Sequence, residues 1–218
     1  MELVTTLIDF ILHLDKHLEQ IIQDYGLLTY AILFLIIFVE TGVVVLPFLP
    51  GDSLLFAAGM LAANEKNGLS VGIIIALLII AAILGDTLNY IIGKYIGPKV
   101  FSRDYKLLKK EHLLKTQQFY DKHGGKTIIY ARFIPIIRTF APFVAGIGNM
   151  KYGKFINYNI IGGIVWVVLF TMAGYLFGNI EVVKTNFTKI ILGIIIVSLM
   201  PAVIEIIKGS KKTSTSLK

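Results

Sequence analysis

The chain has 218 residues, of which 56% are hydrophobic and 16% charged, with a mean hydropathy of +0.76 and a formal net charge of +7. Soluble domains carry about 25% charged residues, so an ordinary soluble protein is excluded and an integral membrane protein is indicated. The absence of cysteine excludes disulfides, thiol catalysis and thiolate metal sites, and no soluble basic domain exists to bind nucleic acid.

Residues 1–25 place apolar side chains at helical spacing, with charged residues between them. This pattern predicts an amphipathic helix that lies on the membrane surface, because the charges are too many for a comfortable crossing. Residues 1–4 lack the basic start of a signal peptide, so we expect no cleaved leader.

Residues 27–63 are apolar but are interrupted by the run Pro47-Phe48-Leu49-Pro50-Gly51-Asp52. The part after this run spans only roughly 16 Å as a helix, whereas a crossing needs about 30 Å. We therefore expect a first re-entrant hairpin, whose break contains Pro47, Pro50 and Gly51. Residues 64–68 then form a surface turn, and residues 71–92 are long enough to cross the membrane.

Residues 94–126 form a polar connector with nine Lys or Arg against three Asp or Glu. The positive-inside rule places this connector in the cytoplasm. Residues 155–178 and 189–207 have the length of further crossings, and the tail 208–218 is basic. The number of crossings after the connector then decides the side of the tail. If residues 127–150 return to the side they came from, the tail lies in the cytoplasm; if they cross, the tail and its four lysines lie outside.

Residues 127–150 are apolar yet carry Arg132, Arg138, Pro135 and Pro142. Each arginine costs roughly 2.5–3.5 kcal/mol at the centre of a membrane helix, and each proline removes an amide donor. A second re-entrant hairpin avoids these costs if its irregular middle, with Pro135 and Pro142 at the break, faces protein or water. We expect its second helix to begin near Thr139.

The two halves of the chain resemble each other. A hairpin, a short turn and a crossing helix occur in residues 27–92 and again in residues 124–178, and the crossings end alike in residues 93–97 and 174–178. Because one crossing separates the hairpins, they enter from opposite faces, as in transporters with inverted repeats. The predicted fold is an all-α integral membrane protein with one membrane domain, residues 1–218.

Five ionisable residues fall within the apolar zone. Guanidinium groups stay charged and suit phosphate oxygens in a bidentate manner, so the two arginines predict an anion site. The alternative is that both arginines pair with Glu40 and Asp52 and only hold the hairpins together. The five residues are Glu40, Asp52, Asp86, Arg132 and Arg138.

The acids have alternatives of their own. Glu40 lies mid-helix without a capping role, which favours proton carriage. Asp52 is either functional or an N-cap of the following helix. Asp86 either faces the cavity or pairs near the interface, close to Lys94. Trp166 lies mid-helix and is interpreted as a packing residue.

Neither a metal site nor an enzyme active site is expected. The four histidines fall in predicted surface segments and do not cluster, and no serine has a histidine placed for a triad. We therefore expect no cofactor and no enzymatic activity. The connector lysines are interpreted as orientation signals and as contacts to anionic membrane lipids. The sequence leaves open whether the protein forms a homo-oligomer.

A characteristic series of motifs runs through residues 25–178 in the order Glu40, the run 47–52, Gly85-Asp86, Tyr90, Gly93, Gly97, Gly125, Arg132-Phe133-Ile134-Pro135, Arg138-Thr139-Phe140, Pro142, Ala145-Gly146 and Met150. This series resembles that of the DedA family, also called the SNARE-associated or VTT-domain family.

The resemblance implies a bacterial multi-pass protein of the cytoplasmic membrane that depends on the proton motive force. It also implies translocation of undecaprenyl phosphate, a polyprenyl phosphate, with essential roles for Glu40, Asp52, Arg132 and Arg138. In the leading hypothesis the arginines bind the phosphate, and the acids, Asp86 included, carry protons or pair with the arginines. The alternatives are a phospholipid scramblase, a proton-coupled antiporter for small cations or drugs, and a scaffold for envelope proteins. Cavity arginines disfavour the antiporter, and a scaffold leaves the buried charges unexplained.

Overall fold

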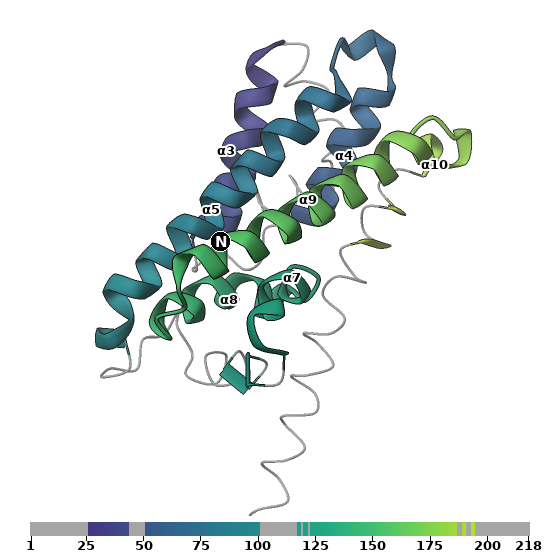
Figure 1. The fold of residues 1–218 in the computed structure, drawn as a ribbon. Coiled ribbons are helices and arrows are strands. Elements are labelled where there is room, and N and C mark those ends of the chain that lie inside the picture. The colour runs from purple at the N-terminus through teal and green to yellow at the C-terminus, as the bar shows by residue number, and fades with distance from the viewer. Residues whose placement is uncertain are drawn as a thin grey trace, which may run out of the picture.

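A computed structural model describes residues 26–43, 51–100, 117–118, 120–121, 123–186, 189–190 and 193–194. Over these residues all regular secondary structure is helical, joined by short turns, and there is no strand (Figure 1). The predictions for the amphipathic segment 1–25, for Pro47 and Pro50, for most of the basic connector and last crossing, and for the tail lie outside the described residues.

Two long helices form the frame of the molecule, α5 (Val71–Val100) and α9 (Tyr152–Phe177). Each contains a helical stretch of 26 residues that is apolar enough to cross a membrane. The length of such a stretch is about 39 Å at 1.5 Å per residue. The two helices lie side by side and run in opposite directions (Figure 1). α5 continues beyond residue 92, the predicted end of that crossing.

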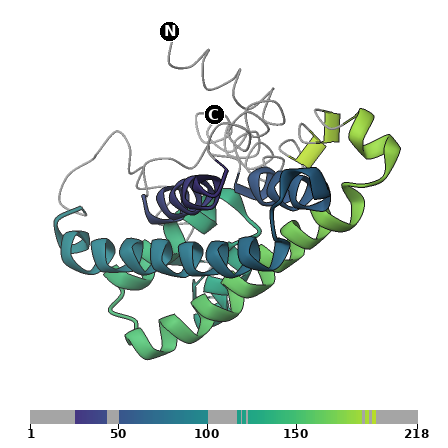
Figure 2. The same ribbon diagram turned by 90° about the horizontal axis from the view of Figure 1, so that it is seen from above.

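The shorter helices pack along this frame (Figure 2). α3 (Leu28–Gly42) and α4 (Gly51–Ala63) have 15 and 13 residues, which gives about 22 and about 20 Å, less than a crossing needs. The second half has the 3-10 turn η2 (Gly124–Lys126), α7 (Thr127–Ala131) and α8 (Pro135–Ile147). The remaining elements are the 3-10 turn η1 (Glu65–Asn67) and α10 (Glu181–Thr185).

Each long helix receives one short helix from each half of the chain. α3 packs on α5 and α7 packs on α9, both within their own half. α4 instead packs on α9, and α8 packs on α5, so the second short helix of each half lies against the long helix of the other half. The two halves therefore interlock, with the same arrangement used twice.

Glycines show how closely the interlocked helices approach. A Cβ added to Gly174 of α9 would lie 1.9 Å from the carbonyl oxygen of Phe56 in α4. A Cβ added to Gly93 of α5 would lie 2.1 Å from the carbonyl oxygen of Phe143 in α8. Both distances are far below van der Waals contact, so only glycine allows these backbones to touch.

The same contacts occur in the reverse direction. A Cβ on Gly59 of α4 would lie 2.0 Å from the carbonyl oxygen of Thr171, and one on Gly146 of α8 would lie 2.1 Å from that of Tyr90. Gly59 and Gly146 end the matching tetrapeptides 56–59 and 143–146, which read Phe-Ala-Ala-Gly and Phe-Val-Ala-Gly. The packing therefore repeats residue by residue between the two halves.

Long-range hydrogen bonds show which ends of the helices meet. The hydroxyl of Tyr30, at the start of α3, accepts from the amide of Ser70, just before α5, at 2.8 Å. The side-chain amide of Asn179, just after α9, donates to the carbonyl of Ala63, the last residue of α4, at 3.1 Å. The start of α3, the end of α4, the start of α5 and the end of α9 therefore lie at one end of the molecule.

The second helix of the predicted hairpin at 127–150 begins earlier than expected. The sequence predicts a start near Thr139, but α8 begins at Pro135, and Pro142 lies inside the helix. The physical reason is that proline is favoured at the first helical position, while the preceding residue is driven to extended backbone; Ile134 has φ −124° and ψ 104°. The break therefore spans residues 132–134.

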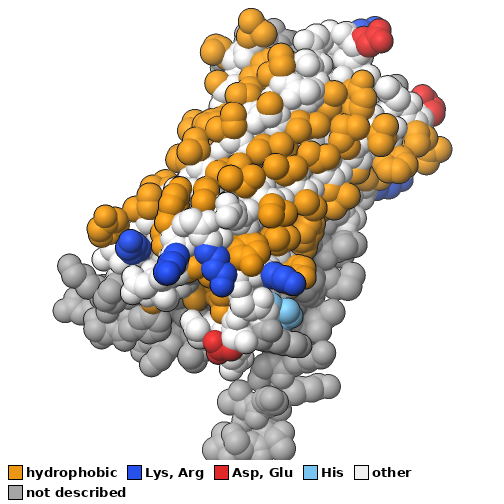
Figure 3. Space-filling view, viewed as in Figure 1, with side chains coloured by type: hydrophobic (Ala, Val, Ile, Leu, Met, Phe, Trp, Pro, Cys, Tyr) orange, Lys and Arg blue, Asp and Glu red, His pale blue; other side chains and the backbone are white. Residues whose placement is uncertain are grey.

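The outer face of α5 and α9 is apolar and exposed (Figure 3). Its side chains include Ile80, Leu84, Ile161 and Leu169, each at least 46% exposed, as expected for a surface that contacts lipid. Figure 3 shows basic side chains in a row along one edge of this apolar face. Exposed lysines near that end of the two helices are Lys94, Lys126, Lys151 and Lys154.

Candidate functional site

Arg138 is the centre of a buried ion-pair cluster formed by three helices. Its side chain, 8% exposed, extends from the first half of α8. Nη1 donates to Oδ1 of Asp52 at 2.9 Å, and Nη2 donates to Oε1 of Glu40. Glu40 belongs to the last turn of α3 and Asp52 to the first turn of α4. One guanidinium therefore joins both short helices of the first half to α8.

The positions of the two acids in their helices differ in electrostatic effect. Asp52 lies at the N-terminus of α4, where the helix dipole stabilises a negative charge. Glu40 lies at the C-terminus of α3, where the dipole opposes a negative charge. Glu40 therefore depends more on the guanidinium of Arg138 for its stability as an anion.

Gly51 has a steric role at this cluster. It is the first residue of α4, and a Cβ placed there would lie 3.0 Å from the carboxyl carbon of Glu40. A side chain at this position would displace the carboxyl group. The glycine predicted at the hairpin break thus allows Glu40 to pack against the start of α4.

Arg132 forms a second cluster with a different acid. It follows α7 directly, is 2% exposed, and its Nη2 donates to Oδ2 of Asp86 and to Oδ1 of Asn159, both at 2.6 Å. Asn159 is held in turn, because its Nδ2 donates to the carbonyl of Ile83 at 3.0 Å. Nε and Nη1 of Arg132 are buried and have no hydrogen-bond partner among the described residues.

The predicted pairing alternative is therefore correct for one arginine and wrong for the other. Arg138 pairs with both Glu40 and Asp52, whereas Arg132 pairs with Asp86. The pairing near the interface with Lys94, considered for Asp86, is wrong, because Asp86 is 3% exposed and faces Arg132.

Trp166 is a site residue that the sequence does not identify. Its indole Nε1 donates to Oδ1 of Asp52 at 2.7 Å, and its ring is fully buried. The central guanidinium carbons lie over this ring, at 5.2 Å from its centroid for Arg138 and 5.6 Å for Arg132. The interpretation as a packing residue alone is wrong. A buried indole N–H needs a partner, which is the signal that could have drawn attention to it.

Asn89 is a further polar residue that sequence patterns miss. From α5, its Nδ2 donates to the carbonyl of Thr139 in α8 at 2.9 Å and to that of Thr41 in α3 at 3.3 Å. Its Oδ1 is buried without a hydrogen-bond partner among the described residues. Asn89 thus links a short helix of each half to α5, beside the two arginine clusters.

Together the two clusters form one buried polar region between the halves of the chain. The first half supplies Glu40, Asp52 and Asp86, and the second half supplies Arg132 and Arg138. Within the part of the chain that the structure describes, no group of three or more His, Cys, Asp or Glu side chains is arranged to hold a metal ion. The chemistry on offer is that of paired carboxylates and guanidiniums in an apolar surrounding.

The amino-acid sequence matches the VTT domain over residues 49–176, from the start of α4 to the end of α9. It is also 56% identical to Protein DedA of Escherichia coli strain K12, over the whole length of both chains. The chain belongs to the DedA family. The segment matched to the VTT domain includes Asp52, Asp86 and both arginines, whereas Glu40 lies before it and is covered by the full-length match.

Other members of the DedA family are more distant. An uncharacterized membrane protein of Mycobacterium tuberculosis strain H37Rv is 42% identical over 79% of this chain and 76% of its own length. Inner membrane protein YqjA of Escherichia coli strain K12 is 33% identical over 84% of this chain and 82% of its own length. Both are named as membrane proteins rather than as enzymes. No solved structure matches the chain.

Proposed function

We propose that this DedA-family protein is a lipid transporter that moves undecaprenyl phosphate across the bacterial cytoplasmic membrane, coupled to proton movement. The observation that carries the proposal is the state of Arg132. Its guanidinium is 2% exposed, yet Nε and Nη1 have no partner among the described residues. A buried charged donor without an acceptor is costly, and a phosphate group offers the oxygens that would satisfy it.

The depth of the site supports transport rather than binding at a surface. Asp86 lies about 22 Å along α5 from Val71 and about 15 Å from Ile96, at 1.5 Å per residue. Trp166 lies about 21 and about 16 Å from the two ends of α9. If both helices cross the membrane, the charged clusters therefore lie near its midplane, where ionisable groups are usually functional.

We further propose that the short helices are re-entrant. α3 starts and α4 ends at the same end of the molecule, and each is too short to cross. α7 and α8 would form the equivalent hairpin from the opposite face. Their broken ends meet at the charges, which is where transporters with inverted repeats bind substrate. The phosphate would cross through this region while the prenyl chain stays in lipid along the apolar outer face.

The charge balance supports coupling to protons. Three carboxylates face two guanidiniums, so the clusters sum to −1 when every group is ionised. A phosphate would make this buried region more negative, and proton uptake by a carboxylate would restore the balance. Glu40 is the proposed carrier, because its Oε2 has no hydrogen-bond partner among the described residues and it opposes the dipole of α3.

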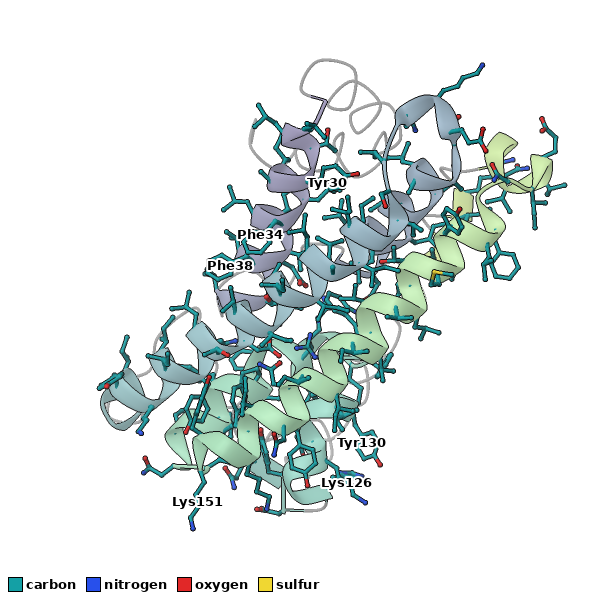
Figure 4. The ribbon with its side chains drawn as sticks, turned by 45° about the horizontal axis from the view of Figure 1, so that its top comes forward. Tyr30, Phe34, Phe38, Lys126, Tyr130 and Lys151 are labelled. Carbon is teal, nitrogen blue, oxygen red and sulfur yellow. The ribbon has the colours of Figure 1, made fainter. Side chains whose placement is uncertain are left out.

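The exposed lysines at one end support an orientation. Lys126 and Lys151 project away from the helices at the same end of the molecule (Figure 4), where Lys94 and Lys154 are also exposed. By the positive-inside rule this end faces the cytoplasm, where these lysines would contact anionic lipids. The C-terminal tail would lie on the same side, as the parity of the crossings predicts.

The test is the leaflet exposure of undecaprenyl phosphate in cells that depend on this protein. Cells with Arg132→Lys or Arg138→Ala should accumulate the lipid phosphate in the outer leaflet, because the head group can no longer be bound. Cells with Lys66→Ala, a change in the exposed turn after α4, should behave as the wild type. Unchanged exposure in both arginine variants at normal protein levels would refute the proposed function.

A phospholipid scramblase is the second candidate, because guanidinium groups bind the phosphate of a phospholipid by the same hydrogen bonds. Liposomes that contain the purified protein separate the two candidates. A transporter coupled to protons moves undecaprenyl phosphate faster when a proton gradient is imposed. A scramblase moves labelled phospholipids at the same rate with or without the gradient.

A further inference from the structure

Trp166 occupies a special position in the buried polar region. It is the single tryptophan of the chain, it lies near the middle of α9, and its side chain is fully buried. Its N–H group donates to Asp52, and the guanidinium carbons of Arg132 and Arg138 both lie within 6 Å of its ring centroid, at 5.6 and 5.2 Å. The indole therefore touches members of both arginine clusters.

The hydrogen bond to Asp52 orients the carboxylate. Oδ1 of Asp52 accepts from the indole of Trp166 at 2.7 Å and from Nη1 of Arg138 at 2.9 Å. Two donors on one oxygen restrict the rotation of the carboxylate, and one of them comes from a long helix of the frame. The other donor, Arg138, is the group that would have to release Asp52 to bind an anion. Trp166 would then keep Asp52 in place.

The ring contributes separately. A cation near the face of an indole is attracted by the ring electrons, and this attraction is larger where water is excluded. Both guanidiniums contact the same buried ring, although their like charges repel each other. A change in the position or partners of either arginine therefore alters the surroundings of the indole.

We propose that Trp166 is a positioning residue of the transport site, whose N–H group holds Asp52 ready to re-pair with Arg138 after the anion leaves. This proposal rests on the proposed function, since it assigns Trp166 a step in the same cycle. It differs from a packing role, which needs only the volume of the ring. Phenylalanine supplies a smaller ring without the N–H group, so Trp166→Phe removes the hydrogen bond to Asp52, and a buried-ring control on the same helix accounts for the lost packing.

The first experiment uses the fluorescence of the wild-type protein in lipid nanodiscs. Because the chain has one tryptophan, all indole emission comes from this site. Undecaprenyl phosphate should change the emission, whereas undecaprenol, which lacks the phosphate, should not. Asp52→Asn should change the emission without any added lipid, because it weakens the acceptor of the indole N–H. Emission that is insensitive to Asp52→Asn overturns the proposal, whatever the substrate is.

The second experiment compares transport by Trp166→Phe with its stability. A hydrogen bond to a charged group is equivalent to about a ten- to hundredfold change in an equilibrium, so the rate should fall by roughly tenfold or more. The melting temperature should also fall, because a buried hydrogen bond and part of the ring volume are lost, so the decisive measurement is the dependence of the rate on pH, which should shift. Phe155→Leu, which removes a buried ring from the same helix away from the arginines, should lower stability without shifting the pH profile.

The two experiments distinguish the proposal from the function on which it rests. Wild-type protein that does not transport undecaprenyl phosphate refutes the proposed function, while the response of the emission to Asp52→Asn still tests the position of Trp166. Wild-type protein that transports the lipid, combined with unchanged rate and pH profile in Trp166→Phe, refutes the proposed role of Trp166 alone.

Discussion

Arg132→Lys is the substitution that most directly separates binding from folding. In the structure, Nη2 of Arg132 holds Asp86 and Asn159, while Nε and Nη1 remain without partners among the described residues. A lysine keeps the positive charge and can still pair with Asp86 through its single nitrogen. It cannot also present two separate N–H groups in the direction of Nε and Nη1, because its donors radiate from one atom.

The magnitude follows from the hydrogen bonds that would be lost. Each hydrogen bond to a charged group contributes about 1.5–3 kcal/mol, so losing both weakens binding of the phosphate by roughly 3 kcal/mol or more. This corresponds to a rise in Kd of about a hundredfold or more. Arg132→Ala has a different cost, because it leaves Asp86 buried without its charged partner. Breaking such a buried pair destabilises a protein by about 3–5 kcal/mol.

The assay is the binding of undecaprenyl phosphate to purified protein in nanodiscs, together with the melting temperature of each variant. Arg132→Lys should bind far more weakly than the wild type at a similar melting temperature, and Arg132→Ala should lose both binding and stability. Wild-type affinity in Arg132→Lys would show that the free N–H groups do not hold the phosphate. The argument that the unpartnered donors of Arg132 define the anion site would then be wrong.

Three other substitutions test separate parts of the structure. Glu40→Gln removes the proposed proton carrier, so transport into liposomes should slow and no longer respond to an imposed proton gradient. Gly174→Ala places a Cβ 1.9 Å from a carbonyl oxygen of α4 and should lower the free energy of unfolding by about 1–3 kcal/mol in a thermal melt, whereas Gly153→Ala on the same helix, with nothing within 4 Å, should have no such effect. Asn89→Ala removes hydrogen bonds to the carbonyls of α3 and α8, which should cost about 1–3 kcal/mol and increase the amide hydrogen exchange of both helices.

The charged members of the site were predictable because a buried charge is costly wherever its partner lies. Arg132, Arg138 and Asp86 each interrupt an apolar run, and the structure buries all three. Their pairing was not predictable, since Arg132 and Asp86 are 46 residues apart and meet only through the packing of α5 with the second half. Sequence spacing contains no information on that choice of partner.

Uncharged members of the site gave no comparable signal. Asn89 and Asn159 lie in long apolar helices, where one amide side chain costs little compared with a charge and forms no motif. The start of α8 was missed for a different reason. Either of two prolines could mark the start of this helix in the sequence. Pro135, which is preceded by extended backbone, begins the helix, and Pro142 lies inside it.

The contacts between helices lead to a hypothesis about which helices move during transport, and the close contacts at glycines define the helices that stay together. The closest backbone contacts at glycines, 1.9–2.1 Å from the added Cβ, join α4 to α9 and α5 to α8, whereas a Cβ at Gly85 of α5 would lie 2.9 Å from the nearest backbone atom of α3. α4 and α8 therefore extend the frame of α5 and α9 to four helices, which cannot separate without losing this close packing. Asp52, Asp86, Arg138 and Trp166 all lie on that frame.

Glu40 instead lies in α3, and Arg132 directly follows α7. Both of these helices pack on the long helix of their own half. Opening the site by moving α3 and α7 would release one partner from each arginine cluster while leaving the frame intact. Because the chain has no cysteine, pairs of spin labels can be attached at introduced cysteines without background. The distribution of distances between labels on α3 and α4 should then broaden when undecaprenyl phosphate is added, while the distribution between labels on α4 and α9 stays the same. A broader distribution between α4 and α9 would mean that the frame itself opens.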